Sequence, residues 1–365
     1  MVDSLRAAVI RWTTVVPVVA LAALALTWGR DNPGWVVGVA AVLLAGAVLS
    51  AVHHAEVVAH RVGEPFGSLV LAVAVTAIEV ALIITLMAGG GDKSASLARD
   101  TVFAAVMITC NGIVGLCLLV GALRGGVARF NPEGTGAALA TVATLAGLSL
   151  VLPTFTTSSP GPKFSSQQLV FAALASAMLY GLFVTTQTVR HRDDFLPLTS
   201  EGERVDEETY VPPSAREARF SLGLLGLALV AVVGLAKVIS PTLEDGVKSA
   251  GLPEAVVGVV IALLVLLPES IAAYRAALRD RVQTSLNLAL GSAIASMGLT
   301  IPAVAVATIW LDGPLLLGLG ATHMVLLALT VGVGILTVVP GKATPLQGGV
   351  HLSLLAGYIV LAINP

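Results

Sequence analysis

The chain has 365 residues, of which 56% are hydrophobic and only 12% are charged, and its mean hydropathy is +0.93. A soluble domain carries about 25% charged residues, so this composition excludes a soluble protein and is typical of a polytopic membrane protein. The formal net charge of −2 gives no support for a nucleic-acid partner, and the partner that the composition implies is the lipid bilayer.

Apolar runs of membrane-spanning length recur along the whole chain, and a spanning helix needs about 20 apolar residues. In chain order the expected spans are 11–28, 34–52, 66–90, 101–123, 135–153, 167–190, 219–240, 254–274, 284–309, 314–339 and 347–363. The expected fold class is therefore an all-α integral membrane protein with eleven transmembrane helices. The first run follows Arg6 and Arg11 without a clear small-x-small cleavage site, so we interpret it as a retained anchor.

The basic residues between the spans predict the orientation of the chain. The side that holds the N-terminus carries 14 Lys and Arg residues, and the opposite side carries 6. The positive-inside rule then places the N-terminus in the cytoplasm and the C-terminus outside. Arg outnumbers Lys 15 to 5, which is typical of a GC-rich bacterial genome, so the expected location is a bacterial inner membrane.

The third span, VLAVAVTAIEVALIITLM (70–87), contains a single acid, Glu79. A lone ionised carboxylate in an apolar medium is very costly, and an intramembrane acid is a candidate functional residue by default. The following span also carries polar residues in its middle, in MITCNGIVG (107–115), where Asn111 stands.

The polar segment HRDDFLPLTSEGERVDEETYVPPSARE (191–217) interrupts the apolar runs after the sixth span, and its composition predicts a flexible cytoplasmic loop. The expected organisation is an N-terminal anchor helix (1–33), a first transmembrane repeat (34–190), the acidic loop (191–218) and a second transmembrane repeat (219–365). Asp206, Glu207 and Glu208 suggest regulatory calcium, but the spaced ligands of an EF-hand are absent, so a solvated linker is favoured.

A short pattern occurs in both halves of the chain. EVVAHRVGEP (56–65) and EDGVKSAGLP (244–253) both fit E-x6-G-x-P, and each precedes a span with one acid inside it. Glu79 lies 23 residues after Glu56, and Glu269 lies 25 residues after Glu244. Because five spans separate the copies, they have opposite orientations in the membrane. Two inverted five-helix repeats, typical of secondary transporters, are therefore expected after an extra N-terminal helix.

The two acids, Glu79 and Glu269, are the candidate ligands for a metal cation. Calcium takes six to eight oxygen ligands, and two carboxylates supply a charge of −2. Burial favours the protonated form of a carboxyl group and a bound cation favours the ionised form, so the pair holds either the cation or protons. That competition is sufficient for antiport, with no cofactor beyond the transported ions.

Other residues are candidates for supporting roles. Pro268 removes a helix hydrogen bond and frees carbonyl oxygens beside Glu269. Glu56 and Glu244 are expected at the cytoplasmic and outer mouths of the ion path. There they either gate the path or relay protons, or they simply cap helix ends. The candidate side-chain oxygens are those of Thr76, Asn111, Ser292 and Ser296, each of which has packing as its alternative role.

At these residues the sequence resembles the calcium/cation antiporter superfamily, and within it the ChaA-type calcium–proton (sodium–proton) antiporters of bacteria. The resemblance extends over nearly the whole chain and is closest in AVTAIEVALIITLMAGG, in AMLYGLFVTTQT and in LLPESIAAYRAALRDRVQTSLNLALGSAIASMGLTIP. It implies that Glu79 and Glu269 meet at the membrane centre and bind the cation. Relatives in the wider group have Gly-Asn upstream of each acid, whereas this chain has VTAIE and LLPES, so the remaining ligands are not carried over.

The function that these observations favour is calcium expulsion in exchange for protons. The alternatives are a Na+(K+)/H+ antiporter that uses the same acids and, less favoured, a passive cation channel. An enzyme is not expected: HHAEVVAH (53–60) places His53, Glu56 and His60 on one helical face but is not the zincin motif. We interpret these histidines and His54 mainly as an amphipathic helix end, with a pH sensor or a regulatory metal as the alternatives.

Overall fold

The structure is a computed structural model, and it describes all residues except 1, 64–65, 91–94, 197–211, 254 and 312; the side chains of 2–11, 66–69, 89–90 and 244 are also outside the described part. The helices are α1 (Val2–Thr27), α2 (Gly34–Val62), α3 (Phe66–Gly90), α4 (Leu97–Met107), α5 (Val114–Gly125), α6 (Pro132–Ala146), α7 (Leu152–Phe155), α8 (Ser166–Thr185), α9 (Ala215–Ser249), α10 (Ala255–Leu278), α11 (Val282–Ala307), α12 (Ala321–Val338) and α13 (Pro345–Ile363).

Short π-helical and 3₁₀ turns complete the helical part of the described residues. The π-helical turns are η2 (Ile108–Ile113), which joins α4 to α5, η3 (Gly147–Val151), which joins α6 to α7, and η4 (Thr186–Arg190), which extends α8; η5 (Arg192–Phe195) is a 3₁₀ turn. The joined segments therefore count as single spans. The described residues then contain eleven spans: α1 and ten helical segments that are long and apolar enough to cross a membrane.

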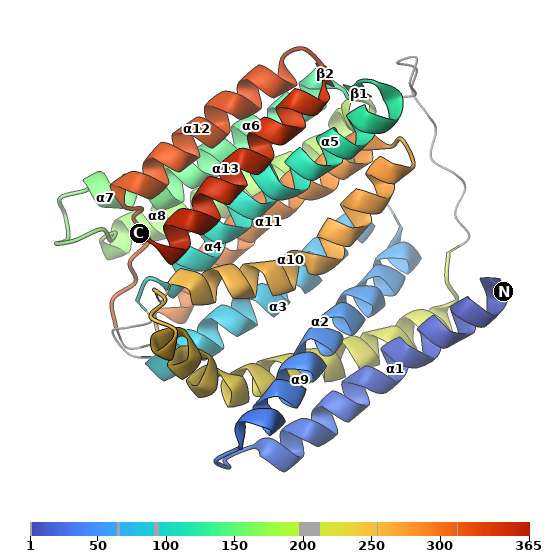
Figure 1. Ribbon diagram of the computed structural model, residues 1–365, viewed down its shortest axis with the longest axis vertical. Coiled ribbons are helices and arrows are strands. Elements are labelled where there is room, and N and C mark those ends of the chain that lie inside the picture. Colours follow the sequence, from blue (N-terminus) through green and yellow to red (C-terminus); the bar gives the residue numbers. More distant parts are fainter. Residues whose placement is uncertain (1, 64–65, 91–94, 197–211, 254, 312) are drawn as a thin grey trace.

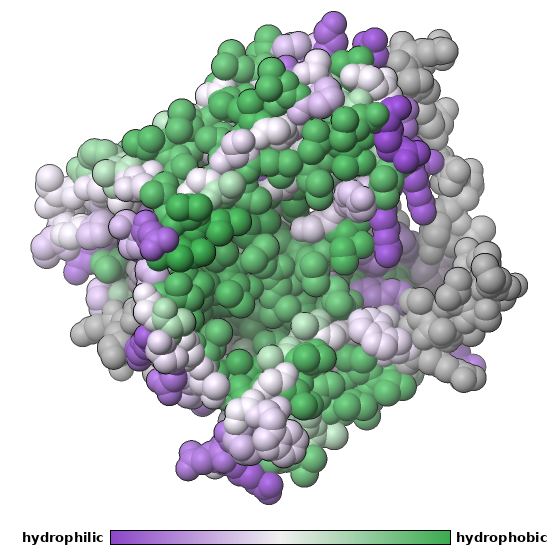
Figure 2. Space-filling model, in the orientation of Figure 1, coloured by the Kyte–Doolittle hydropathy of each residue, from purple (hydrophilic) through white to green (hydrophobic). Residues whose placement is uncertain are grey.

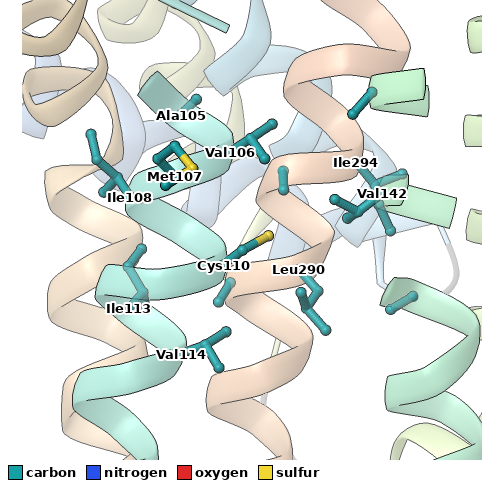
Figure 3. Packing of buried hydrophobic residues seen from close by; sticks show 14 of the residues in the cluster. Ala105, Val106, Met107, Ile108, Cys110, Ile113, Val114, Val142, Leu290 and Ile294 are labelled. Carbon is teal, nitrogen blue, oxygen red and sulfur yellow. The ribbon is translucent and has the colours of Figure 1, made fainter. Parts of the chain in front are cut away.

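The spans form two groups with separate hydrophobic cores. One core is built from α1, α2, α3, α9 and the first half of α10, and the other from α4, α5, α6, α8, α11, α12 and α13. Figure 3 shows part of the second core, where residues of α4 and η2 pack against Leu290 and Ile294 of α11. In Figure 1, α3 and α10 lie where the two groups meet. Helix α10 joins them, because Ile261 belongs to one core and Leu266 to the other.

The surface of the bundle fits a bilayer. Large apolar side chains are exposed on its sides, among them Trp35 and Leu336, each 74% exposed. In Figure 2 hydrophobic residues cover the side of the molecule and hydrophilic residues gather toward its two ends. The N- and C-termini lie at opposite ends of the bundle, as an odd number of spans requires (Figure 1).

Local sequence explains where several helices begin. Ser165 and Ser214 each form a capping box with the residue three positions later, Gln168 and Glu217. Asn131 caps α6, which starts with a proline at its first position. A very short antiparallel ladder, β1 (Ala128–Arg129) with β2 (Lys342–Ala343), ties two turns at one end of the bundle together.

The predicted spans are confirmed as helices, but four bounds were wrong, the first being that of α1, which begins at Val2 rather than at residue 11. Helices α2 and α9 run well past the expected 34–52 and 219–240, because amphipathic sequence continues each helix beyond its apolar run. The expected span 314–339 begins as a helix only at Ala321, and residues 313–320 have no regular secondary structure. Pro314, Gly318 and Gly320 explain this difference, since neither residue type favours a helix interior.

Candidate functional site

Glu79 of α3 is buried at the contact between the two groups of helices. Its side chain is 5% exposed, and its Oε1 atom accepts a hydrogen bond of 2.5 Å from Oγ of Ser296 on α11. The hydroxyl of Thr300, one helical turn after Ser296, also acts on the Glu79 carboxyl group, although its Oγ1 atom is buried without a hydrogen-bond partner in the described part of the chain. Helix α11 therefore presents two hydroxyl groups to one carboxyl group, an arrangement that suits an ionised carboxylate or a bound cation.

Glu269 of α10 faces the same region from the other side. It directly follows Pro268, whose ring lacks the N–H that would otherwise bond the carbonyl of Leu264. Its Oε2 atom is buried and has no hydrogen-bond partner in the described part of the chain. The acidic groups that act electrostatically on Glu269 are Glu56 and Glu79. The structure thus brings the two repeat-matched acids close enough for their charges to interact.

The other predicted oxygen donors are distributed unevenly. Thr76 is buried one turn before Glu79 on α3, and Ser292 lies partly buried one turn before Ser296 on α11. Residues three or four positions apart share a helix face, so both are placed on the faces that carry Glu79 and Ser296. Thr300 was missed by the sequence analysis, although its spacing of four residues from Ser296 was a usable signal.

Asn111 points into a different buried network. Its side-chain Nδ2 donates to Thr330 Oγ1 of α12 over 2.9 Å, and its Oδ1 lies 3.1 Å from Nδ1 of His351 on α13. The hydroxyl of Thr337 lies 3.1 Å from Nε2 of the same histidine. Both ends of the Asn111 amide are therefore occupied by helices that do not carry the two glutamates.

Of the two glutamates expected at the mouths of the ion path, the structure describes the side chain of Glu56 but not that of Glu244. Glu56 lies on α2, is partly buried, and interacts electrostatically with Arg275 of α10 as well as with Glu269. The side chain of Glu244 in α9 is outside the described residues. The loop acids Asp206, Glu207 and Glu208 are also outside them.

His54 of α2 has a structural partner in α1. The carbonyl oxygen of Thr13 accepts hydrogen bonds from Ser50 Oγ (2.6 Å) and from His54 Nε2 (3.1 Å). This carbonyl is free because Pro17, four residues later, has no N–H to offer it. Within the described residues no group of three or more His, Cys, Asp or Glu side chains is arranged to hold a metal ion.

Comparisons with known proteins agree with this architecture. A sequence model of the sodium/calcium exchanger protein family matches residues 33–189 and 220–364. The chain is 46% identical over 361 residues to a putative ionic transporter, y4hA, of Sinorhizobium fredii (strain NBRC 101917 / NGR234), which covers 97% of this chain and 96% of the relative. It is 34% identical over 349 residues to the sodium-potassium/proton antiporter ChaA of Escherichia coli (strain K12), covering 95% and 94%.

Two solved structures share the fold at low sequence identity. Native YfkE superposes with a TM-score of 0.72 at 14% identity, covering 98% of this chain and 99% of YfkE. The H+/Ca2+ exchanger CAX superposes with a TM-score of 0.67 at 17% identity, covering 96% and 91%. The resemblance in the sequence is confirmed, and the chain is a multi-pass membrane transporter rather than an enzyme. It belongs to the sodium/calcium exchanger protein family, within the calcium/cation antiporter superfamily.

Proposed function

We propose that the protein is a secondary cation/proton antiporter in which Glu79 and Glu269 hold either a cation or protons. The observation that carries this proposal is the meeting of these two acids, one from each half of the chain, at the contact between the two groups of helices. Acids buried in a membrane protein mark ion or proton pathways. A carboxyl group that loses its proton when a cation arrives couples the two fluxes without any further device.

Calcium is the cation that the charge of the site favours. Two carboxylates neutralise a divalent ion, and the hydroxyl groups of Ser296 and Thr300 add neutral oxygens on the Glu79 side. Thr76, Ser292 and the carbonyl freed by Pro268 are proposed as further oxygen ligands. In the proposed reaction calcium leaves the cytoplasm while protons enter, across a bacterial inner membrane with the N-terminus on the cytoplasmic side.

Glu56 is proposed as the relay between the site and the cytoplasmic end of α2. It shares an electrostatic neighbourhood with Glu269 on one side and with exposed Arg275 on the other. A carboxyl group that lies between a buried acid and an exposed basic residue is able to pass protons or to attract cations. Glu244 would have the matching role at the opposite mouth.

A second candidate function is Na+(K+)/H+ antiport through the same two acids. The relative that supports it is the sodium-potassium/proton antiporter of Escherichia coli, which is 34% identical to this chain over nearly its full length. The occupied amide of Asn111 leaves fewer neutral oxygens for the site than the sequence suggested. A site with fewer fixed oxygen ligands favours an ion that keeps part of its water shell, or an ion of lower charge.

Flux measurements in proteoliposomes test the proposal and separate the candidates. With an acidic lumen and a pH dye inside, external Ca2+, Na+ or K+ is added separately, and antiport makes the lumen more alkaline. A response to Ca2+ alone supports calcium/proton exchange, whereas a response to Na+ or K+ supports the second candidate. Fast cation flux that is independent of pH would instead indicate a passive channel and overturn the proposal.

A further inference from the structure

A small apolar cluster lies beside the Glu79–Ser296 contact, toward one end of the bundle. Ile83 of α3, Ala98 of α4 and Val304 of α11, here called the outer plug, are 0%, 1% and 1% exposed and form a separate core. Ile83 is one turn after Glu79, and Val304 is one turn after Thr300. The plug therefore stacks on the site toward the end where α3 ends and α4 begins, which the distribution of basic residues places outside.

An irregular segment lies at this end of the bundle and contacts the plug. Residues 313–320, here called the strap, place Leu315 against the outer plug and bury Leu317 and Leu319 in the larger core. Backbone hydrogen bonds hold the strap at three points: Leu316 N to Ala95 O (2.9 Å), Gly318 N to Pro162 O (2.9 Å) and Leu319 N to Leu150 O (2.8 Å). A Cβ atom on Gly318 would overlap the Thr154 side chain and backbone, so this crossing requires glycine.

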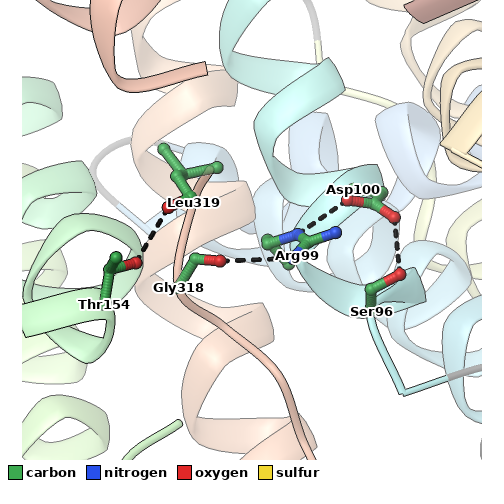
Figure 4. A network of polar contacts seen from close by, with 6 residues as sticks. All are labelled: Ser96, Arg99, Asp100, Thr154, Gly318 and Leu319. Atoms are coloured by element: carbon green, nitrogen blue, oxygen red, sulfur yellow. Dashed lines mark hydrogen bonds and ion pairs between the residues drawn. The ribbon is translucent and has the colours of Figure 1, made fainter. Parts of the chain in front are cut away.

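Arg99 connects the strap to the helix that carries part of the plug. Its Nη1 atom donates to the carbonyl oxygen of Gly318 over 3.2 Å, and its Nε atom donates to Asp100 Oδ1 over 2.8 Å. The other oxygen of Asp100 accepts from the hydroxyl of Ser96 over 2.8 Å. Figure 4 shows this chain of contacts, with Arg99 between the strap and the first turn of α4. The side chains of Arg99 and Asp100 are only 18% and 8% exposed, so water competes weakly for these bonds.

We propose that the outer plug is the external gate of the ion site and that Arg99 is the positioning residue that keeps it shut through the strap. Access from the outside requires Ile83, on a helix of one group, to separate from Ala98 and Val304, on helices of the other. The Arg99–Gly318 bond holds Leu315 against the plug and opposes that separation. The assignment of the plug to an ion path rests on the proposed function, whereas its accessibility is measurable without any transport.

The two approaches to the site differ in character, which supports this assignment. Toward the outside the residues next to Glu79 are apolar and fully buried. Toward the other end Glu269 and Glu56 are partly exposed and Arg275 is exposed. The site is thus bordered by a buried apolar cluster toward the outside and by charged, partly exposed residues toward the cytoplasmic end.

Thiol accessibility tests the gate directly. The full-length protein is reconstituted with Ile83→Cys supplying its only thiol, after replacement of the buried Cys110 and Cys117 by alanine. A membrane-impermeant maleimide is then added from the outside, and the labelling rate is compared with and without Arg99→Ala. Loss of a charge-assisted bond shifts an opening equilibrium roughly tenfold, so we expect about tenfold faster labelling with Arg99→Ala.

Several variants make the result specific. Arg30→Ala, an exposed arginine in the turn between α1 and α2, is the matched control and should leave the rate unchanged. Arg99→Lys, which keeps the charge but not the forked donor geometry, should give an intermediate rate, and Leu315→Ala should accelerate labelling even if Arg99→Ala fails to fold. Equal rates in all variants, or immediate labelling of the introduced thiol in the Ile83→Cys protein alone, would overturn the gate. Altered labelling in a protein that transports no cation would overturn only the proposed function.

Discussion

Glu79 and Glu269 occupy matched positions in the two halves of the chain, yet the structure gives them unequal surroundings. Glu79 Oε1 accepts a hydrogen bond from Ser296, with Thr300 beside it, whereas Glu269 Oε2 is buried without a partner among the described residues. Glu269 instead has two acids, Glu56 and Glu79, as its electrostatic neighbours. A repeat in the sequence therefore predicts which residues meet, but the donors around each acid depend on the individual neighbouring helices.

The largest effect is expected when either acid is removed. In Glu79→Gln and in Glu269→Gln, cation-driven proton flux in proteoliposomes should fall to the level of empty liposomes, because the amide neither carries a proton nor balances the cation. Glu133→Gln, an exposed residue in the first turn of α6, is the control and should transport normally. Robust flux in both site variants, with protein shown to be folded, would contradict the proposal that these two acids form the ion site.

Loss of the donor to Glu79 should weaken the site without destroying it. A hydrogen bond to a charged group contributes about 1.5–3 kcal/mol, so Ser296→Ala should raise the KM for the cation roughly ten- to a hundredfold. The matched control is Ser149→Ala, a buried serine whose hydroxyl bonds the carbonyl of Leu145 in its own span. If Ser296→Ala leaves the KM within a factor of about two of the original, the different hydrogen-bond partners of the two acids have no role in cation binding.

The pH dependence of transport sharpens the same comparison. Protons and cations compete, so lowering the pH should raise the apparent KM for the cation. The slope reports the number of protons displaced: about tenfold per pH unit for one proton and about a hundredfold for two. Because both acids are proposed to hold a proton when the cation is absent, we expect the hundredfold slope. Initial rates at several cation concentrations and pH values measure it, and a tenfold slope would show that only one of the two acids exchanges its proton.

The sequence predicted the spans well because they depend on a strong, local signal, and the two acids, which stay a prediction as ion ligands, were chosen on a signal of the same kind. The length of an apolar run alone defines a spanning helix, and a carboxylate within such a run rarely has a purely structural role. The strap could not be predicted from hydropathy, because residues 314–320 are as apolar as the helix after them; Pro314 and the glycines were the only signal. Asn111 was placed by spacing, but it lies in the π-helical turn η2, where the wider turn changes the direction of side chains relative to an α-helix.

Asn111 gives the smallest expected effect on transport and the most direct test of that last point. Asn111→Ala leaves the Thr330 and His351 side chains without this partner, and an unsatisfied buried polar group costs about 1–3 kcal/mol, so the variant should be less stable. The melting temperature in detergent should fall, while the KM for the cation should stay within about twofold of the original because both amide atoms bond away from the two acids. Asn364→Ala, at the exposed C-terminal end, serves as the control and should change neither quantity.

A rise in KM of about tenfold or more at an unchanged melting temperature would show that Asn111 turns toward Glu269 during transport. The two halves of the site would then become alike in that state, with Ser296 of α11 serving one acid and Asn111 of η2 serving the other.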